Sequence, residues 1–150
     1  MATLQARYEG MRKALASITP SGNVVVERIT ALILAEYPEI SGHYSRTGVV
    51  GAADPYADGY DWDSMMRAAH LLSHCKPDVI CWNGSKGGSI GFAADRELCD
   101  RIEAETGTRA CTSTLAIVDA FTARKVRRFG LVTPYRAGYQ AKIQAVYAKE

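Results

Sequence analysis

Short apolar runs alternate with longer amphipathic segments along the chain of 150 residues. Gly, Pro, Asn and Asp separate the two kinds of segment, and the longer segments carry apolar residues at helical spacing. We expect strands at about 14–19, 39–46, 78–82, 108–111 and 128–133, and helices at about 22–36, 58–74, 91–105, 114–124 and 136–149. Parallel strands joined by crossover helices satisfy this order. The sequence therefore predicts an α/β fold with a parallel sheet and helices on both faces.

Two helical segments have apolar faces that we expect to turn toward the sheet. In the first, the face consists of Val26, Ile29, Ile33 and Leu34. In the second, the inward residues are Met65, Met66, Ala69 and Leu72.

The composition excludes several classes of protein. Hydrophobic residues are 47% and charged residues 23%, as in a soluble globular domain, and the length suits one domain. The net charge is +2, and the one dense basic run is at 124–128, so a nucleic-acid partner has little support. No apolar stretch approaches the roughly 18 residues that span a membrane. The first residues show no apolar export signal, which makes the cytoplasm the expected location.

The four cysteines and three histidines show no metal-ligand spacing. Cys75, Cys81, Cys99 and Cys111 contain no C-x-x-C pair. We interpret them as reduced, buried thiols, for which a disulfide is not expected in a reducing compartment. His70 and His74 are four residues apart but have no third ligand, so no metal is predicted.

A parallel sheet binds ligands beyond the carboxyl ends of its strands. The candidate site therefore lies in the loops at 20–23, 83–89, 112–114 and 134–136.

The loop at 83–89 is the strongest candidate for binding an anion. Gly84, Gly87 and Gly88 allow close backbone approach at a helix start, and Ser85, Ser89 and Lys86 add donors. Its spacing fits neither a Walker loop nor the dinucleotide fingerprint, so a small carboxylate or free phosphate suits it better than a nucleotide. A plain strand-to-helix turn is the alternative.

Two other junctions carry polar groups with the same ambiguity. Ser21 or Asn23 in the loop Pro20-Ser21-Gly22-Asn23 either caps the next helix or binds a ligand, and residues 112–114 pose the same question. Tyr135, at the end of the last predicted strand, either donates to a carboxylate or lies on the surface.

A short internal repeat suggests a second structural unit. The sequence SITP at 17–20 recurs as LVTP at 131–134, and a predicted helix follows each copy. We therefore expect an N-terminal extension at 1–13, a first α/β lobe at 14–124, and at 125–150 the first strand and helix of a second lobe that is apparently truncated.

Four loop motifs together resemble the aspartate/glutamate racemase superfamily, in the branch of maleate cis-trans isomerases and arylmalonate decarboxylases. They are ITPSGNVVVE at 18–27, DVICWNGS at 78–85, TGTRACTST at 106–114 and VRRFGLVTPY at 126–135. The resemblance implies two flavodoxin-like lobes, cofactor-independent chemistry and a small carboxylate substrate held in the cleft. Carried over by position, it implies that the substrate-binding residues are Pro20, Ser21, Asn23, Gly84, Ser85 and Tyr135.

The sequence departs from the family pattern at Asn83, where racemases and isomerases of this superfamily carry a catalytic cysteine. An amide cannot act as a thiol nucleophile. Arylmalonate decarboxylases also lack this first cysteine, so the resemblance favours a decarboxylase-like lyase or isomerase with Asn83 and Tyr135 as catalytic donors. The partner thiol would lie outside these 150 residues, which alone would be half a catalyst. The alternative is a non-catalytic carboxylate-binding or assembly module; an uncovered sheet edge would favour a homo-oligomer.

Overall fold

The computed structural model describes residues 13–49 and 56–149. Its sheet has four strands in the order β2-β1-β3-β4, and every pairing is parallel. The strands are β1 (Lys13–Pro20), β2 (Ile40–Thr47), β3 (Val79–Trp82) and β4 (Ala110–Thr112). The helices are α2 (Val26–Leu34), α3 (Trp62–Ser73), α4 (Gly87–Ile90), α5 (Phe92–Thr106), α6 (Ser113–Ala123) and α7 (Ala137–Tyr147). The predicted α/β fold with a parallel sheet is confirmed.

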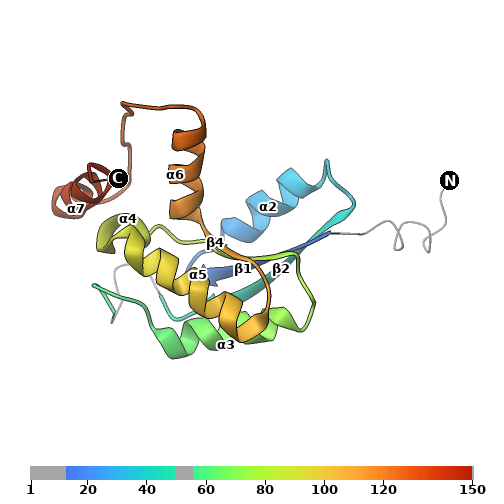
Figure 1. Ribbon diagram of the computed structural model, residues 1–150. Coiled ribbons are helices and arrows are strands. Elements are labelled where there is room, and N and C mark those ends of the chain that lie inside the picture. The colour runs from blue at the N-terminus through green and yellow to red at the C-terminus, as the bar shows by residue number, and fades with distance from the viewer. Residues whose placement is uncertain (1–12, 50–55, 150) are drawn as a thin grey trace.

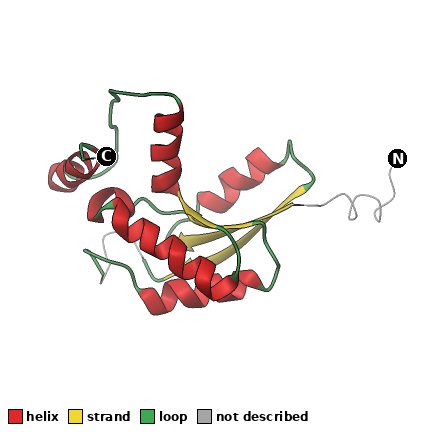
Figure 2. Ribbon diagram, viewed as in Figure 1, coloured by secondary structure: helices red, strands yellow, loops and turns green. Residues whose placement is uncertain are grey.

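Helices lie on both sides of the sheet (Figure 1). Helices α3 and α5 cover one face, and α2 and α6 lie on the other side. Figure 2 shows the same layers coloured by secondary structure, with α7 beside α4 and apart from the strands.

The hydrophobic core lies between the sheet and helices α3 and α5. Alternate residues of the two central strands point to this face and are buried: Ala16, Ile18, Ile80 and Trp82. The two helices contribute Met65, Ala68, Ala69, Leu72, Leu98 and Ile102, and Met66 packs at the margin. The predicted inward face of α3 is confirmed.

Helix α2 corrects the prediction that its apolar face joins the core. None of its residues is buried, and Ile29 and Ile33 are 48% and 58% exposed. The spacing is amphipathic, but the apolar face of α2 packs only partly on the sheet. A helical repeat in sequence shows that an apolar face exists, and only the neighbouring elements decide how much of it they cover.

Because α5 is buried and α2 is largely exposed, the same substitution should lower the free energy of unfolding more in α5 than in α2. Ile102→Val in α5 should lower the free energy of unfolding by about 1 kcal/mol, because Ile102 is fully buried and the lost methyl leaves a void. Ile33→Val in α2 is the matched control. It changes helix propensity by the same amount, but at a side chain that is mostly exposed. Urea unfolding of both variants measures the difference; equal losses would contradict this assignment of the core.

The last predicted strand is also corrected. Residues 128–133 lie outside the sheet and form no strand, and Val132 is 97% exposed. An extended segment is a strand only when a neighbouring strand accepts its backbone hydrogen bonds, and no described residue does so here.

The predicted N-terminal extension at 1–13 lies outside the described residues except for Lys13, which is the first residue of β1. Within 13–49 and 56–149, no helix combines the length and apolar character needed to cross a bilayer.

Candidate functional site

The carboxyl ends of β1 and β3 lie next to each other. Ile18 pairs with Trp82, and the backbone N–H of Asn83 donates to the Ile18 carbonyl at 2.8 Å. The chain therefore leaves both strands at one edge of the sheet, where the loops at 20–23 and 83–89 begin.

The loop after β3 contacts the segment that contains Tyr135. The Ser85 and Tyr135 hydroxyls are 2.7 Å apart, and Ser89 donates to the Tyr139 hydroxyl at 2.8 Å. The Tyr135 and Tyr139 rings meet edge to face, with centroids 4.8 Å apart. The structure thus brings together Ser85 and Tyr135, which are 50 residues apart in the chain.

Gly84 lies where the backbone passes a large side chain. A Cβ on Gly84 would lie 2.3 Å from the Trp82 indole, closer than two carbon atoms can approach. Glycine is therefore required at this position to keep Trp82 in the core and still turn the chain toward Ser85.

The loop at 20–23 is held mainly by the backbone at 47–49, which follows β2, and by Arg46. The Asn23 Oδ1 atom accepts the N–H groups of Val25 at 2.9 Å and Val26 at 3.2 Å at the start of α2. The Ser21 hydroxyl donates to the Val49 carbonyl, and the Arg46 guanidinium donates to the Ser21 and Asn23 carbonyls at 3.0 and 2.9 Å. Of the two predicted roles for Asn23, the structure shows the helix-start contact.

Asn83 follows β3 directly, beside the start of α6. Its Oδ1 atom accepts from the Ser113 hydroxyl at 3.3 Å. This contact involves only the oxygen of the Asn83 side-chain amide, and the two N–H donors are on its nitrogen, Nδ2. The neighbouring Thr112 hydroxyl accepts the Leu115 N–H at 3.1 Å, which is the helix-cap role considered for residues 112–114.

Lys86 does not turn toward Ser85. Its ammonium donates to the Tyr56 carbonyl and lies 5.7 Å from the centre of the Tyr60 ring. The anion-binding potential of the loop therefore comes from its hydroxyls and backbone amides.

A buried carboxyl group lies beneath the loop. Asp95, in the first turn of α5, is fully buried and accepts from the Tyr60 and Thr112 hydroxyls. Burial raises the pKa of Asp95 above its usual range, and the hydroxyl donors partly oppose this shift. Gly87 packs directly on the carboxyl group, since a Cβ there would lie 2.1 Å from Oδ1. Asp95 thus ties α5, β4 and the loop after β3 together.

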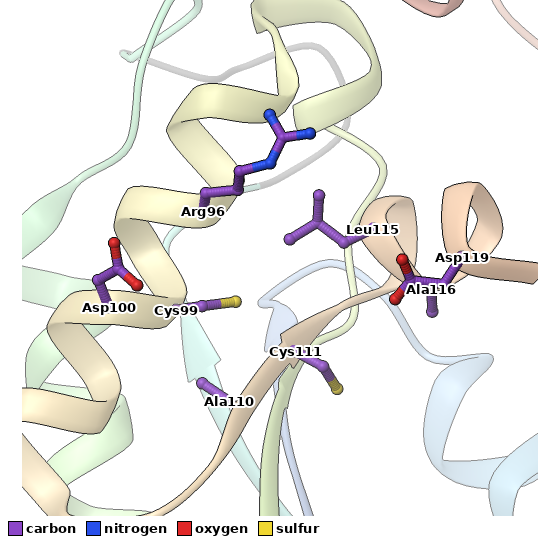
Figure 3. A pocket seen from close by; sticks show the side chains of 8 residues that line it. All are labelled: Arg96, Cys99, Asp100, Ala110, Cys111, Leu115, Ala116 and Asp119. Atoms are coloured by element: carbon purple, nitrogen blue, oxygen red, sulfur yellow. The ribbon is translucent and has the colours of Figure 1, made fainter. Parts of the chain in front are cut away.

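A cavity of about 360 Å³ opens at the outer edge of β4, beside the predicted loop at 112–114. Helices α5 and α6 form its walls, and Figure 3 shows Arg96, Cys99 and Asp119 around it. Cys111 of β4 also lines this cavity.

The cysteines correct the prediction of buried thiols. Cys75 is exposed, and Cys81, Cys99 and Cys111 are only partly buried. Cys81 points away from the core, because its strand neighbours Ile80 and Trp82 fill the core face.

The histidine pair is a ring contact. His70 and His74 meet edge to face, with ring centroids 4.8 Å apart. Among residues 13–49 and 56–149, no three His, Cys, Asp or Glu side chains gather as metal ligands.

Sequence reasoning did not identify Arg46, Asp95 or Tyr60 as parts of this region, whereas Ser113 lies in the predicted loop at 112–114. Arg46 lies at the carboxyl end of β2, which is the available sequence signal. Asp95 has no such signal, because an acidic residue in a first helical turn is ordinarily exposed.

Three solved structures show what this fold is similar to. Maleate isomerase Iso from Pseudomonas putida S16 matches with a TM-score of 0.80 at 24% identity, over 91% of this chain and 59% of that chain. Nocardia farcinica maleate cis-trans isomerase matches with 0.76 at 20%, over 91% and 58%. Unliganded arylmalonate decarboxylase matches with 0.72 at 24%, over 92% and 57%. No protein-family model and no curated protein matches the sequence.

The chain spans less than three fifths of the length of these structures. The TM-scores of 0.72–0.80 show that the chain has the α/β fold of these maleate isomerase and arylmalonate decarboxylase structures.

Proposed function

We propose that this chain forms part of the site of an isomerase or lyase that acts on a small carboxylate or dicarboxylate without a cofactor. The observation that carries the proposal is the contact between Ser85 and Tyr135 at the carboxyl end of β3. The structural neighbours are enzymes named as maleate isomerases and arylmalonate decarboxylases, and one Nocardia farcinica structure contains a covalently bound succinylcysteine intermediate.

The chemistry of the hydroxyl pair suits a carboxylate. While Ser85 and Tyr135 bind each other, one hydroxyl donates to the other. A carboxylate between them would accept from both, and hydrogen bonds to a charged group are about twice as strong as neutral ones. The same donors would stabilise the negative charge of an enediolate formed by decarboxylation or deprotonation.

Asn83 serves in this proposal as a further donor. Its side-chain oxygen is held by Ser113, and an amide does not titrate near neutrality, so it cannot carry the proton in the reaction. We propose that Pro20, Ser21 and Asn23 form the neighbouring wall, because β1 and β3 end at the same edge.

Binding of maleate to the 150-residue chain, measured by calorimetry, tests the proposal. Ser85→Ala and Tyr135→Phe should each weaken binding roughly 10-fold or more, the worth of one hydrogen bond to a charged group. Tyr37→Phe is the matched control, because Tyr37 precedes β2 at the opposite edge of the sheet and is 47% exposed.

Equal affinities for the site variants and the control would contradict the site, as would equally tight binding of the neutral diamide of maleate. Turnover of maleate or phenylmalonate, followed by NMR, separates the two candidate functions. If a longer protein that also contains the catalytic thiol expected outside these 150 residues bound maleate without turnover, the non-catalytic carboxylate-binding module would be favoured.

A further inference from the structure

Cys81 and Cys111 face each other across the two strands β3 and β4. They are direct partners in the parallel register, so both side chains project from the same face of the sheet. Adjacent strands lie about 4.8 Å apart, within the roughly 4.4–6.8 Å that separates the Cα atoms of disulfide-bonded cysteines. Each thiol affects the ionisation of the other.

The two sulfur atoms differ in their surroundings. Cys111 is partly exposed on the edge strand β4, where a small solute can reach it, whereas Cys81 lies on the inner strand β3. The facing Cys81 thiol and the nearby positive charge of Arg109 lower the pKa of Cys111 to about 7. The facing Cys111 thiol and burial raise the pKa of Cys81, which therefore keeps its proton.

We propose that Cys81 and Cys111 are a redox modification site, in which a hydroperoxide oxidises Cys111 and Cys81 then closes a disulfide with it. Neither cysteine takes part in the proposed carboxylate chemistry.

The step balances in atoms and electrons. The Cys111 thiolate attacks one oxygen of hydrogen peroxide, the O–O bond breaks, and the departing hydroxide takes a proton to become water. Cys111 is then a sulfenic acid. The Cys81 sulfur attacks the Cys111 sulfur, an S–S bond forms, the S–O bond breaks, and the second hydroxide leaves as water with the Cys81 proton. Two thiols are oxidised by two electrons, and one peroxide is reduced to two waters.

The disulfide would form directly below the candidate site. Asn83 lies two residues after Cys81, and Ser113 lies two residues after Cys111. The Ser113 hydroxyl contacts both the Trp82 carbonyl and the Asn83 side chain at 3.3 Å. Oxidation at the strand pair therefore acts on the contact that orients Asn83.

Peptide mapping after treatment with hydrogen peroxide tests the proposal. The experiment uses the full chain with Cys75→Ser, because Cys75 is exposed and trypsin leaves Cys75 and Cys81 on the same peptide, at 68–86. We expect peptide 68–86 joined to peptide 110–124, while Cys99 on peptide 97–101 stays open to alkylation.

A second measurement does not depend on the disulfide. In the reduced chain near pH 7, Cys111 should react with iodoacetamide about 100-fold faster than Cys99, whose pKa burial raises to about 12. With Cys81→Ser, peroxide should leave Cys111 as a sulfenic acid that dimedone traps.

A disulfide between Cys99 and Cys111, over-oxidation of Cys111 beside an alkylated Cys81, or equal alkylation rates of Cys111 and Cys99 would overturn the assignment. Because no carboxylate is present in these experiments, their outcome is independent of the proposed function.

Discussion

Gly87→Ala is expected to lower the free energy of unfolding by about 3 kcal/mol or more. The new Cβ would lie 2.1, 2.2 and 2.3 Å from the three carboxyl atoms of Asp95. Asp95 cannot move aside at low cost, because it is fully buried and held by the Tyr60 and Thr112 hydroxyls. The substitution therefore combines overpacking with the loss of buried hydrogen bonds.

Two glycines provide matched controls for this variant. A Cβ on Gly88, the next residue, would meet Tyr147, Ile143 and Thr114 at ordinary distances of 3.4–3.8 Å. A Cβ on Gly138 in α7 would meet nothing within 4 Å, so Gly138→Ala should be neutral or stabilise by up to about 1 kcal/mol. Urea unfolding compares the three variants.

The double variant Gly87→Ala, Asp95→Ala separates the clash from a general intolerance of α4. Once the carboxyl group is removed, the alanine at 87 has space, so the two losses should not add. If Gly87→Ala were as stable as Gly88→Ala, or if the double variant showed full additivity, the close packing of Gly87 on Asp95 would be wrong.

Asp95→Ala is expected to cost about 2–6 kcal/mol. It removes the acceptor of two hydroxyl groups, and each hydroxyl left unpaired in the interior costs about 1–3 kcal/mol. Asp95→Asn keeps the shape and one acceptor oxygen, so it should cost less. Asp100→Asn, on an exposed position of the same helix, is the control and should stay within about 0.5 kcal/mol.

The pH dependence gives Asp95 a second test. Burial raises its pKa in the folded chain above the value of about 3.9 in the unfolded chain. The folded state therefore binds more protons between the two values, and the contribution of Asp95 to stability is complete below about pH 4 and is lost as pH rises through the folded pKa.

The measurable quantity is the difference in unfolding free energy between the unsubstituted chain and Asp95→Asn. It should be largest near pH 4 and shrink toward neutral pH, because the amide does not titrate. A difference that grows with rising pH would mean that the ionised carboxylate is the stabilising form, contrary to the burial of Asp95.

The sequence alone determined the features that depend on local pattern. Periodicity located β1, β2, β3, β4 and the helices after them to within a few residues, because burial on one face imposes a repeat that survives in any context. The loops at the candidate site also followed from topology, since parallel strands end at one edge. The approach of Tyr135 to Ser85 was predicted from resemblance, and the structure places the two hydroxyls in contact.

The tertiary structure decided whatever depends on a partner elsewhere in the chain. Residues 128–133 have a strand-like sequence and form no strand, because no neighbour supplies hydrogen bonds. Helix α2 is amphipathic, yet its apolar face stays largely exposed. The buried carboxyl group of Asp95 accepts hydrogen bonds from Tyr60 and Thr112, which belong to other segments of the chain. Cys81 lies opposite Cys111 only because of the register between β3 and β4. Which apolar faces are covered, and which strand residues become partners, depends on contacts between segments far apart in the chain, so the local pattern alone does not determine them.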